Sequence, residues 1–211
     1  MKVLAVSDAV TEALFSEGIR EHCAGVELVL ACGDLPSDYL EYIVTMLNVP
    51  LLYVLGNHDR PRESADGDLI EGPQGGRNVD GRIVRIRSRS GGEVRVAGLE
   101  GSMFYNGGRH QYTESQMCAK ALRLAPKLLA SRLTSGRPLD VLITHAAPHG
   151  IHDGQDPCHR GFRAFAALMR RFGPRYLIHG HVHPSYGYDA RPRVFGRTTV
   201  LSVYGYKLLE I

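Results

Sequence analysis

The sequence lacks an apolar run of the length that a membrane span needs, which is about 18 residues. Its start does not resemble a signal sequence, because Asp8 interrupts the apolar run there, so we expect a cytoplasmic protein. Strong charge is missing too, since 25 Lys and Arg residues oppose 22 Asp and Glu residues. A net charge of +3 gives no strong whole-molecule field, so nucleic acid and anionic membranes have no support as partners.

Cysteine is scarce, and its spacing shows no C-x-x-C pair. Regular predicted elements surround the four cysteines, which argues against a small disulfide scaffold and predicts reduced thiols at Cys23, Cys32, Cys118 and Cys158. Internal repeats, linkers and low-complexity segments are also missing. With 44% apolar residues, 211 residues suffice for one sizeable core, so we expect a single domain over residues 1–211.

Short apolar segments alternate with helical ones in the first third of the chain. The predicted strands are residues 2–7, 27–31 and 50–55, and the predicted helices are residues 11–23 and 37–47. This order favours a mainly parallel sheet, in which polar residues just beyond the carboxyl ends of the strands meet at one edge. Asp8, Asp34 and Asn57 stand at that position in three successive strands, so we expect them to converge.

The rest of the chain predicts hairpins, loops and two longer helices. The glycine-rich residues 66–80 predict a surface loop, and residues 82–88 and 93–97 predict a hairpin whose alternating Arg85, Arg87 and Arg89 suggest a charged edge strand. A capping box of Thr113 and Gln116 opens a helix to about residue 133, in which Pro126 predicts a kink or a break. Later segments predict strands 139–143 and 175–178, a helix ending at Gly173, and two closing strands in 198–211.

Residues of metal-ligand type follow five predicted strands: Asp8, Asp34, Asn57, His145, and the pair His181 and His183. One Asp after a strand is more often a turn or cap residue, and one His is more often hydrogen-bonded than a ligand. Their recurrence at one kind of position favours a metal site instead. Carboxylate oxygen and imidazole nitrogen suit Mn, Fe, Co, Ni or Zn. Alternate residues of an extended segment point opposite ways, so the histidine pair predicts a two-metal cluster.

These residues, in this order, resemble the calcineurin-like metallophosphoesterase family along essentially the whole chain. Gly56-Asn57-His58-Asp59 and Gly180-His181-Val182-His183 together carry the resemblance. Residues 144–148, and residues 156–162 with His159 and Gly161, resemble the branch that includes class III cyclic nucleotide phosphodiesterases and their animal relatives. The resemblance implies a four-layer αββα sandwich, an α/β fold with two mixed β-sheets flanked by helices, which periodicity alone does not give.

The resemblance also implies a role for each site residue. Asp34 would bridge two divalent ions, with Asn57, His145 and His181 completing one site and Asp8 and His183 holding the other. Manganese is the expected metal, with Fe, Zn, Ni, Co and Mg as alternatives. His58 would donate a hydrogen bond to phosphate or a proton to the leaving oxygen, and Asp59 would orient His58. His159, from the same likeness, and Arg109, from the glycine-rich loop 101–111, are expected to contact substrate.

Val10 departs from the family pattern, which normally opens with Asp-x-His. The first metal site therefore lacks one neutral ligand, and we expect it to bind its ion weakly, with water in the open position. A replacement ligand from Glu12, His149 or His152, or a single occupied site, are the alternatives.

The predicted function is hydrolysis of a small phosphoester, most simply a phosphodiester such as a cyclic nucleotide, by attack of a metal-bound hydroxide on phosphorus. A phosphomonoesterase or a nuclease could use the same centre. A partly degenerate metallo-fold that acts as a protein-binding scaffold is the rival from another class. Loss of the histidine at position 10 favours the scaffold, whereas His58, which a scaffold does not need, favours catalysis.

Overall fold

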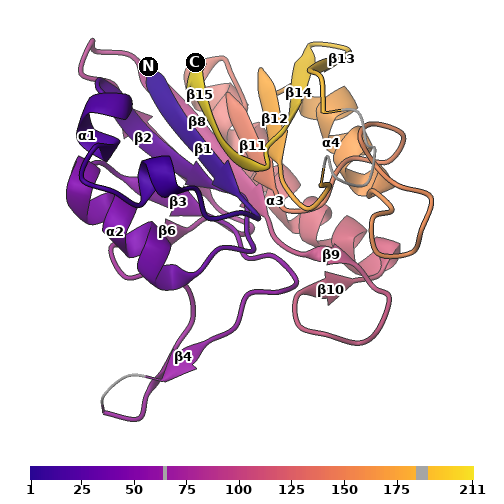
Figure 1. Ribbon diagram of the computed structural model, residues 1–211. Coiled ribbons are helices and arrows are strands. Elements are labelled where there is room, and N and C mark those ends of the chain that lie inside the picture. Colours follow the sequence, from indigo (N-terminus) through magenta and orange to yellow (C-terminus); the bar gives the residue numbers. More distant parts are fainter. Residues whose placement is uncertain (64–65, 184–189) are drawn as a thin grey trace.

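A computed structural model describes residues 1–63, 66–183 and 190–211 of the chain. Two mixed β-sheets pack face to face, and helices cover their outer faces (Figure 1). This is the four-layer αββα sandwich that the family resemblance implied, so the predicted fold class is confirmed. In the described ranges, no helix is both long enough and apolar enough to cross a membrane.

The first sheet has five strands in the order β15-β1-β2-β3-β6. Strands β1, β2, β3 and β6 run parallel, and β15 pairs antiparallel with β1. Their bounds are Gly205–Glu210 for β15, Lys2–Ser7 for β1, Val26–Ala31 for β2, Leu51–Tyr53 for β3 and Gly76–Asn78 for β6. A 3-10 turn (Glu12–Leu14) and helices α1 (Ile19–His22) and α2 (Ser37–Leu47) lie between these strands in sequence and cover the sheet's outer face.

The second sheet has six strands in the order β13-β14-β12-β11-β8-β7. The central strands β14, β12, β11 and β8 are parallel, and the two edge strands are antiparallel to their neighbours. The bounds are Arg193–Phe195 (β13), Thr198–Ser202 (β14), Tyr176–His179 (β12), Val141–Thr144 (β11), Glu93–Leu99 (β8) and Ile83–Arg87 (β7). Helices α3 (Glu114–Ser135) and α4 (Arg163–Phe172) pack on its outer face.

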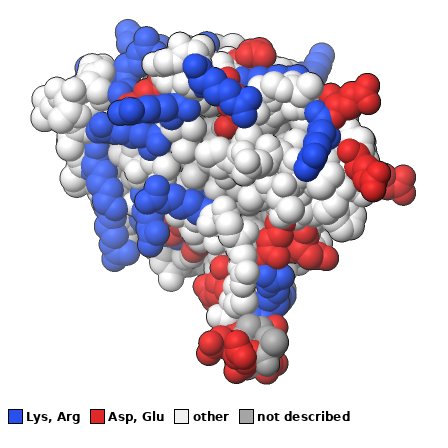
Figure 2. Space-filling model, turned by 90° about the vertical axis from the view of Figure 1, so that its left-hand side faces the viewer, with Lys and Arg blue, Asp and Glu red and all other residues white. Residues whose placement is uncertain are grey.

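Two small ribbons project from this framework. Strand β9 (Ser102–Met103) pairs with β10 (Gln111–Tyr112), and β4 (Arg62–Glu63) pairs with β5 (Leu69–Ile70). Figure 2 shows acidic side chains gathered on the protruding end of the molecule, whereas Lys and Arg gather over the upper part of the same face.

The core explains why the strands are almost continuously apolar. On β1, Val3 and Ala5 face the second sheet, whereas Leu4 and Val6 face the helices, and none of the four is exposed to solvent. A strand buried on both faces has no polar side, so its sequence reads as an apolar run that ends abruptly at the first residue beyond the sheet. The functional residues begin at those ends.

Several predicted elements are confirmed in detail. Strand 2–7 and helix 37–47 have the predicted bounds, and Thr113 and Gln116 form the predicted capping box of α3. Gly173 ends α4 in the left-handed conformation with φ 55°. Strand β7 is an edge strand of the second sheet, with Arg85 and Arg87 exposed beside buried Val84, as the charge pattern indicated.

Other predictions are wrong for identifiable physical reasons. Only two short helical segments form within residues 11–23, because the chain breaks helix geometry between Leu14 and Ile19. Residues 66–80 contain two strands, and β6 adds to the open edge of β3. Of the two outcomes predicted at Pro126, a kink or a break, the break is wrong, because α3 continues through that residue. The proline is on the exposed side, and buried Leu124 and Leu128 beside it anchor the helix, which offsets a cost of about 3 kcal/mol.

Candidate metal centre

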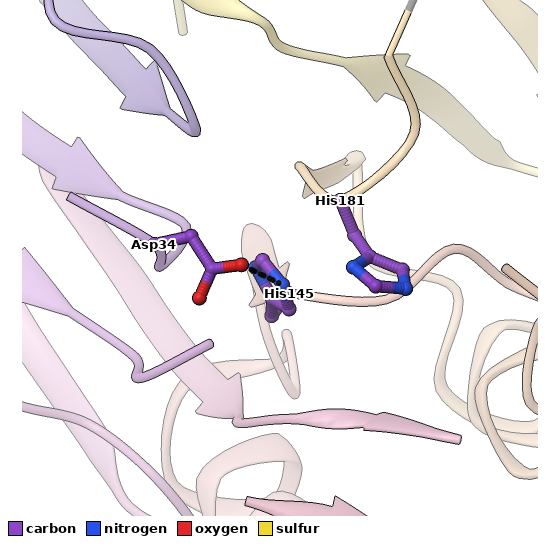
Figure 3. Close-up of side chains that lie close together, drawn as sticks. All are labelled: Asp34, His145 and His181. Carbon is purple, nitrogen blue, oxygen red and sulfur yellow. Dashed lines mark ion pairs between the residues drawn. The ribbon is translucent and has the colours of Figure 1, made fainter. Parts of the chain in front are cut away.

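The predicted ligands come together where the carboxyl ends of strands from the two sheets meet. Asp8 and His145 directly follow β1 and β11, and Asp34, Asn57 and His181 follow β2, β3 and β12 after short turns. Figure 3 shows the side chains of Asp34, His145 and His181, from three separate segments, pointing into one space. One donor atom from each of these three lies within 4.8 Å of the others.

His145 is the most tightly held member of the cluster, with no exposed surface. Its Nδ1 lies 2.7 Å from the carbonyl oxygen of Cys32 and so donates to it. Its Nε2 lies 3.1 Å from Oδ1 of Asn57 and 3.2 Å from Oδ2 of Asp34. Two oxygen acceptors thus face one ring nitrogen, and a positive charge is needed between them, either a proton or a metal ion.

The pKa values of the cluster agree with a site built for a cation. Burial alone would lower the pKa of His145, but the Asp34 carboxylate raises it to about 9. Burial alone would raise the pKa of Asp34, but the charge and hydrogen bond of His145 hold it well below its usual range. Burial and the charge on His145 lower the pKa of His181 to about 4. At neutral pH, Asp34 is therefore a carboxylate and His181 a neutral imidazole, which are the forms that bind divalent ions, whereas His145 carries a proton that a bound ion would displace.

His181 is oriented by the backbone in the same way as His145. Its Nε2 lies 2.7 Å from the carbonyl oxygen of Cys158, which leaves Nδ1 as the candidate ligand atom. The hydroxyl of Tyr105 accepts a 3.3 Å hydrogen bond from Nδ2 of Asn57, which leaves Oδ1 of Asn57 toward the cluster. A carboxylate, an amide oxygen and two oriented imidazoles form a donor set that suits a borderline or hard divalent ion.

Asp8 and His183 form a second pair beside this cluster. Oδ1 of Asp8 lies 3.4 Å from Nε2 of His183, and Oδ2 accepts a 2.8 Å hydrogen bond from the backbone N–H of His181. Val10, with 48% of its surface exposed, supplies no ligand. His149 is hydrogen-bonded to Asp153 at 3.1 Å, and His152 to His179 at 2.9 Å, so neither is placed as a replacement ligand by these contacts.

The ligand loops hold unusual backbone conformations. Asp8, Asp34 and His181 have φ values of 63°, 57° and 67°, a left-handed region that non-glycine residues rarely adopt. Close approach of the loops also requires glycine at position 56. A Cβ added there would lie 2.7 Å from Cε1 of His145 and would press on the Asp34 carboxylate. Such strain is common at functional sites, where surrounding structure must maintain it.

Replacing Gly56 by alanine should therefore damage the centre directly. Overpacking of this kind lowers the free energy of unfolding by about 1–3 kcal/mol. For a chain of this length each kcal/mol corresponds to about 2–4 °C, so the melting temperature should fall measurably. We also expect the variant to retain less metal after dialysis. Gly92→Ala is the matched control, because a Cβ there meets nothing within 4 Å. Equal melting temperature and metal content in both variants would contradict the close packing described.

A hollow of about 340 Å³ adjoins the cluster, and both Asp34 and His58 line it. His58 lies at its rim with an exposed side chain, while its backbone N–H donates to Oδ1 of Asp34 at 2.8 Å. The walls also include Leu40, Tyr53, Arg60, Arg109 and His110. The predicted acid and the predicted substrate contact Arg109 thus share one hollow with Asp34, the candidate bridging ligand.

The Asp59 carboxylate connects two of the turns that carry candidate ligands. Its Oδ2 accepts hydrogen bonds from the backbone N–H groups of Asp34, at 3.0 Å, and Gly56, at 2.7 Å. Burial raises the pKa of this carboxyl, and the hydrogen bond from Gly56 opposes the rise. The carboxylate therefore ties the Asp34 turn to the Gly56 turn, and its hydrogen bonds to described residues do not reach the His58 ring.

The loop that carries Arg109 is anchored by buried polar groups. Arg109 pairs with Glu71 across the hollow, and His110 lies 3.5 Å from Glu100. Burial alone would raise the pKa of Glu100, but hydrogen bonds from His110 and Tyr112 and the nearby Lys120 lower it to about 2. Glu100 is therefore a carboxylate at neutral pH, and it binds His110, Tyr112 and Lys120 beneath the loop.

His159 lies on the other side of the cluster, and it does not line the 340 Å³ hollow. Its ring centroid is 5.1 Å from that of His181, and its Nδ1 lies 2.9 Å from Oδ1 of Asp156. It therefore packs against a candidate metal ligand. His179 is fully buried and hydrogen-bonded to His152.

Comparison with known proteins now identifies the family. A family model described as calcineurin-like phosphoesterase matches residues 1–185. The chain belongs to the calcineurin-like phosphoesterase family. Members are metal-dependent phosphoesterases, generally with a dinuclear centre, so the family agrees with the donor set described above.

A solved structure shares the fold of this member of the calcineurin-like phosphoesterase family. TT1561 of Thermus thermophilus superposes with a TM-score of 0.65 at 18% identity, covering 99% of this chain and 93% of that chain. A single mutant of Vps29 from Entamoeba histolytica gives 0.47 at 16% identity, covering 100% and 86%. Neither the family match nor these structures single out the class III cyclic nucleotide branch. A search of curated protein sequences found no match.

Several groups that shape the centre had no signal in the sequence. The carbonyl oxygens of Cys32 and Cys158 orient His145 and His181, and any residue type can supply a carbonyl. His110 and Arg60 line the hollow without belonging to a motif. Tyr105 also belongs to no motif, yet its hydroxyl contacts the candidate ligand Asn57.

Proposed function

We propose that this calcineurin-like phosphoesterase hydrolyses phosphodiesters. The proposal rests on one observation. Asp34, the candidate bridging ligand, and His58, the candidate acid, line the same 340 Å³ hollow. A phosphoryl group held at the cluster would then have its leaving oxygen near the His58 ring. The hollow offers room for an ester substituent against Leu40 and Tyr53.

The charges around the hollow favour a diester over a monoester. A phosphomonoester is close to a dianion at neutral pH, and its recognition usually relies on available cations. Here Arg109 is paired with Glu71, His110 lies beside Glu100, and Arg60 donates to the backbone carbonyl of Asn57 at 3.2 Å. The cationic side chains of the wall already have partners, which suits a singly charged phosphodiester better.

Two divalent ions fit the residues present. Asp34, Asn57, His145 and His181 would hold one ion, and Asp8, His183 and the shared Asp34 would hold the other, with manganese as the expected metal. Bound ions would neutralise phosphoryl charge and acidify the attacking water. Within the chain, the Cys32 and Cys158 carbonyls keep both imidazoles oriented, and Asp59 keeps the two ligand turns together. His58 would give a proton to the leaving oxygen.

We further propose a substrate class and a cellular location for the protein. The resemblance of residues 156–162 to the class III branch makes cyclic nucleotides the first substrates to try. His159 packs against the ring of His181, and from that position it would contact the bound substrate. We further propose that residues 1–211 act as one domain in the cytoplasm.

Hydrolysis of a substrate panel by purified protein tests the proposal. After removal of metal, Mn²⁺ should restore cleavage of bis-p-nitrophenyl phosphate and of 2′,3′- or 3′,5′-cyclic AMP, with much less cleavage of p-nitrophenyl phosphate. Preference for the monoester, or for single-stranded DNA, would replace the proposal by a phosphatase or a nuclease. No cleavage with any of Mn²⁺, Fe²⁺, Zn²⁺, Ni²⁺, Co²⁺ or Mg²⁺ would favour the scaffold.

Restoring the missing histidine should strengthen the weaker metal site. In Val10→His, an imidazole takes the position that the family pattern gives to a ligand, two residues after Asp8, and residue 10 is exposed enough to accept it. We expect the second equivalent of Mn²⁺ to bind about 10–100-fold more tightly, as measured by calorimetric titration of metal-free protein. Ala9→His is the matched control, since it adds the same imidazole one residue away. Equal tightening in both variants would contradict a vacant ligand position beside Asp8.

A further inference from the structure

Six arginines surround a second hollow, of about 590 Å³, far from the candidate metal centre. We call it the arginine hollow, and its cationic residues are Arg132, Arg137, Arg170, Arg171, Arg175 and Arg197. Asp140 is the one acidic residue among the described residues of its lining. Such a concentration of positive charge contrasts with the balanced composition of the whole chain.

The arginine hollow lies at the opposite end of the second sheet from the metal centre. Residues 136–140 lead into β11 and Arg175 leads into β12, whereas His145 and His181 follow the carboxyl ends of those strands. Strands β11 and β12 are parallel, so the two sets of residues are separated by at least a four-residue strand, about 13 Å. The hollow is therefore a separate site.

Among the residues that the structure describes, five of the six guanidinium groups have no acidic partner. Arg137 lies 3.7 Å from Asp140, and no carboxylate of a described residue lies within 4.0 Å of the other five. The Asp140 carboxylate is also occupied by the backbone N–H of Arg95, at 2.9 Å. Unpaired guanidinium groups facing one hollow repel one another, so a bound anion would stabilise them.

Helix ends account for only part of this charge. Arg132 lies in the last turn of α3, and Arg170 and Arg171 lie in the last turn of α4, where cations complement the helix dipole. Arg137, Arg175 and Arg197 lie outside helices, and no dipole explains them. These three raise the charge beyond what the two helix ends require.

Aromatic rings hold several of the guanidinium groups in place. Arg170 lies over the ring of Phe195 at 5.1 Å, and Arg175 lies over the ring of Tyr176 at 5.4 Å. Stacking of this kind reduces side-chain freedom before a ligand arrives, while leaving the N–H donors at the edge of the group available. Guanidinium groups bind phosphate oxygens through paired, charge-assisted hydrogen bonds.

We propose that the arginine hollow binds a compact anion that carries several phosphate groups, of the class of a nucleoside triphosphate or an inorganic polyphosphate. The arginines surround one concave space instead of forming a stripe, so a compact ligand fits better than an extended strand. A volume of about 590 Å³ is in the range of small-molecule sites. This site is independent of the proposed phosphodiesterase activity.

Calorimetric titration of the full chain tests the proposal with three probes: inorganic tripolyphosphate, the β,γ-methylene analogue of ATP, and adenosine. Both triphosphates should bind, and adenosine should not. Arg175→Gln combined with Arg197→Gln should weaken triphosphate binding at least 10-fold. The matched control, Arg85→Gln with Arg87→Gln on β7, removes the same charge and should change binding less than twofold. All three proteins keep the metal centre, so any binding there is common to them.

Equal weakening in the two double variants, or binding of a 20-nucleotide single strand but of neither triphosphate, would overturn the proposal. Hydrolysis of bis-p-nitrophenyl phosphate and the melting temperature should be unchanged in the double variants, which checks their folding. A second measurement needs no variant: tripolyphosphate should protect Arg175 and Arg197 of the wild type from phenylglyoxal, as mapped by mass spectrometry. Modification of both at an unchanged rate would also overturn it.

Discussion

Replacing Asp34 by asparagine should abolish tight binding of both metal ions and lower kcat/KM for bis-p-nitrophenyl phosphate by about 10³-fold or more. Asparagine keeps the shape and one oxygen of the side chain, so packing changes little. It removes the negative charge that two cations would share and that faces Nε2 of His145 at 3.2 Å. Metal content after dialysis, measured by mass spectrometry of the elements, should fall together with activity.

Asp153→Asn is the matched control for this change. Asp153 is also a poorly exposed carboxylate that accepts backbone hydrogen bonds, from Gly150 at 2.9 Å and Gly161 at 3.2 Å, but it belongs to no candidate metal cluster among the described residues. We expect it to affect the melting temperature more than the metal content. If Asp34→Asn kept both ions and most activity, a bridging role for Asp34 would be ruled out.

The strand ends that carry the candidate ligands were predictable because the burial that makes each strand apolar is a local property of its sequence. Strand β1 is buried on both faces, so its apolar run stops at Asp8, and the same reasoning places Asp34 after β2. Parallel neighbours then bring these ends to one edge. The ligand types and their positions were therefore readable from sequence, although the assignment of each to an ion came from the family resemblance.

The two-sheet arrangement is not local, which is why periodicity did not predict it. The last two strands follow each other around Gly205, yet β14 joins the second sheet and β15 joins the first. That choice depends on contacts with β12 and β1, which are distant in sequence. Strand β6 is similar, because Gly76, Arg77 and Asn78 have little strand propensity and pair only because β3 offers them an open edge.

The role of Asp59 shows another limit of sequence reasoning. Its place next to His58 suggested that it orients that ring, but neighbouring side chains in a turn need not point the same way. In the structure its carboxylate accepts hydrogen bonds from the backbone of Asp34 and Gly56. Nearly every residue has the same backbone groups. The two hydrogen bonds of Asp59 to backbone N–H groups therefore could not be predicted from residue types, and neither could the Cys32 carbonyl that orients His145.

Replacing His58 by alanine should separate substrates by their leaving group. If His58 protonates the leaving oxygen, cleavage of a cyclic nucleotide, which expels a poorly stabilised alkoxide, should fall by about 10²–10⁴-fold. Cleavage of bis-p-nitrophenyl phosphate should fall much less, because p-nitrophenolate leaves without a proton. The measurement is kcat/KM for both substrates at saturating Mn²⁺.

The contrast between the two substrates distinguishes an acid from a structural residue. Loss of a merely structural contact would lower both rates by a similar factor, and so would loss of a metal ion. His22→Ala is a suitable control, because His22 is exposed on α1 and its ring bonds the Tyr206 hydroxyl, away from the hollow. If wild type and His58→Ala cleaved the cyclic nucleotide at the same rate, the exposed ring at the rim beside Asp34 would have no part in proton transfer, and the enzyme proposal would lose the residue that a scaffold does not need.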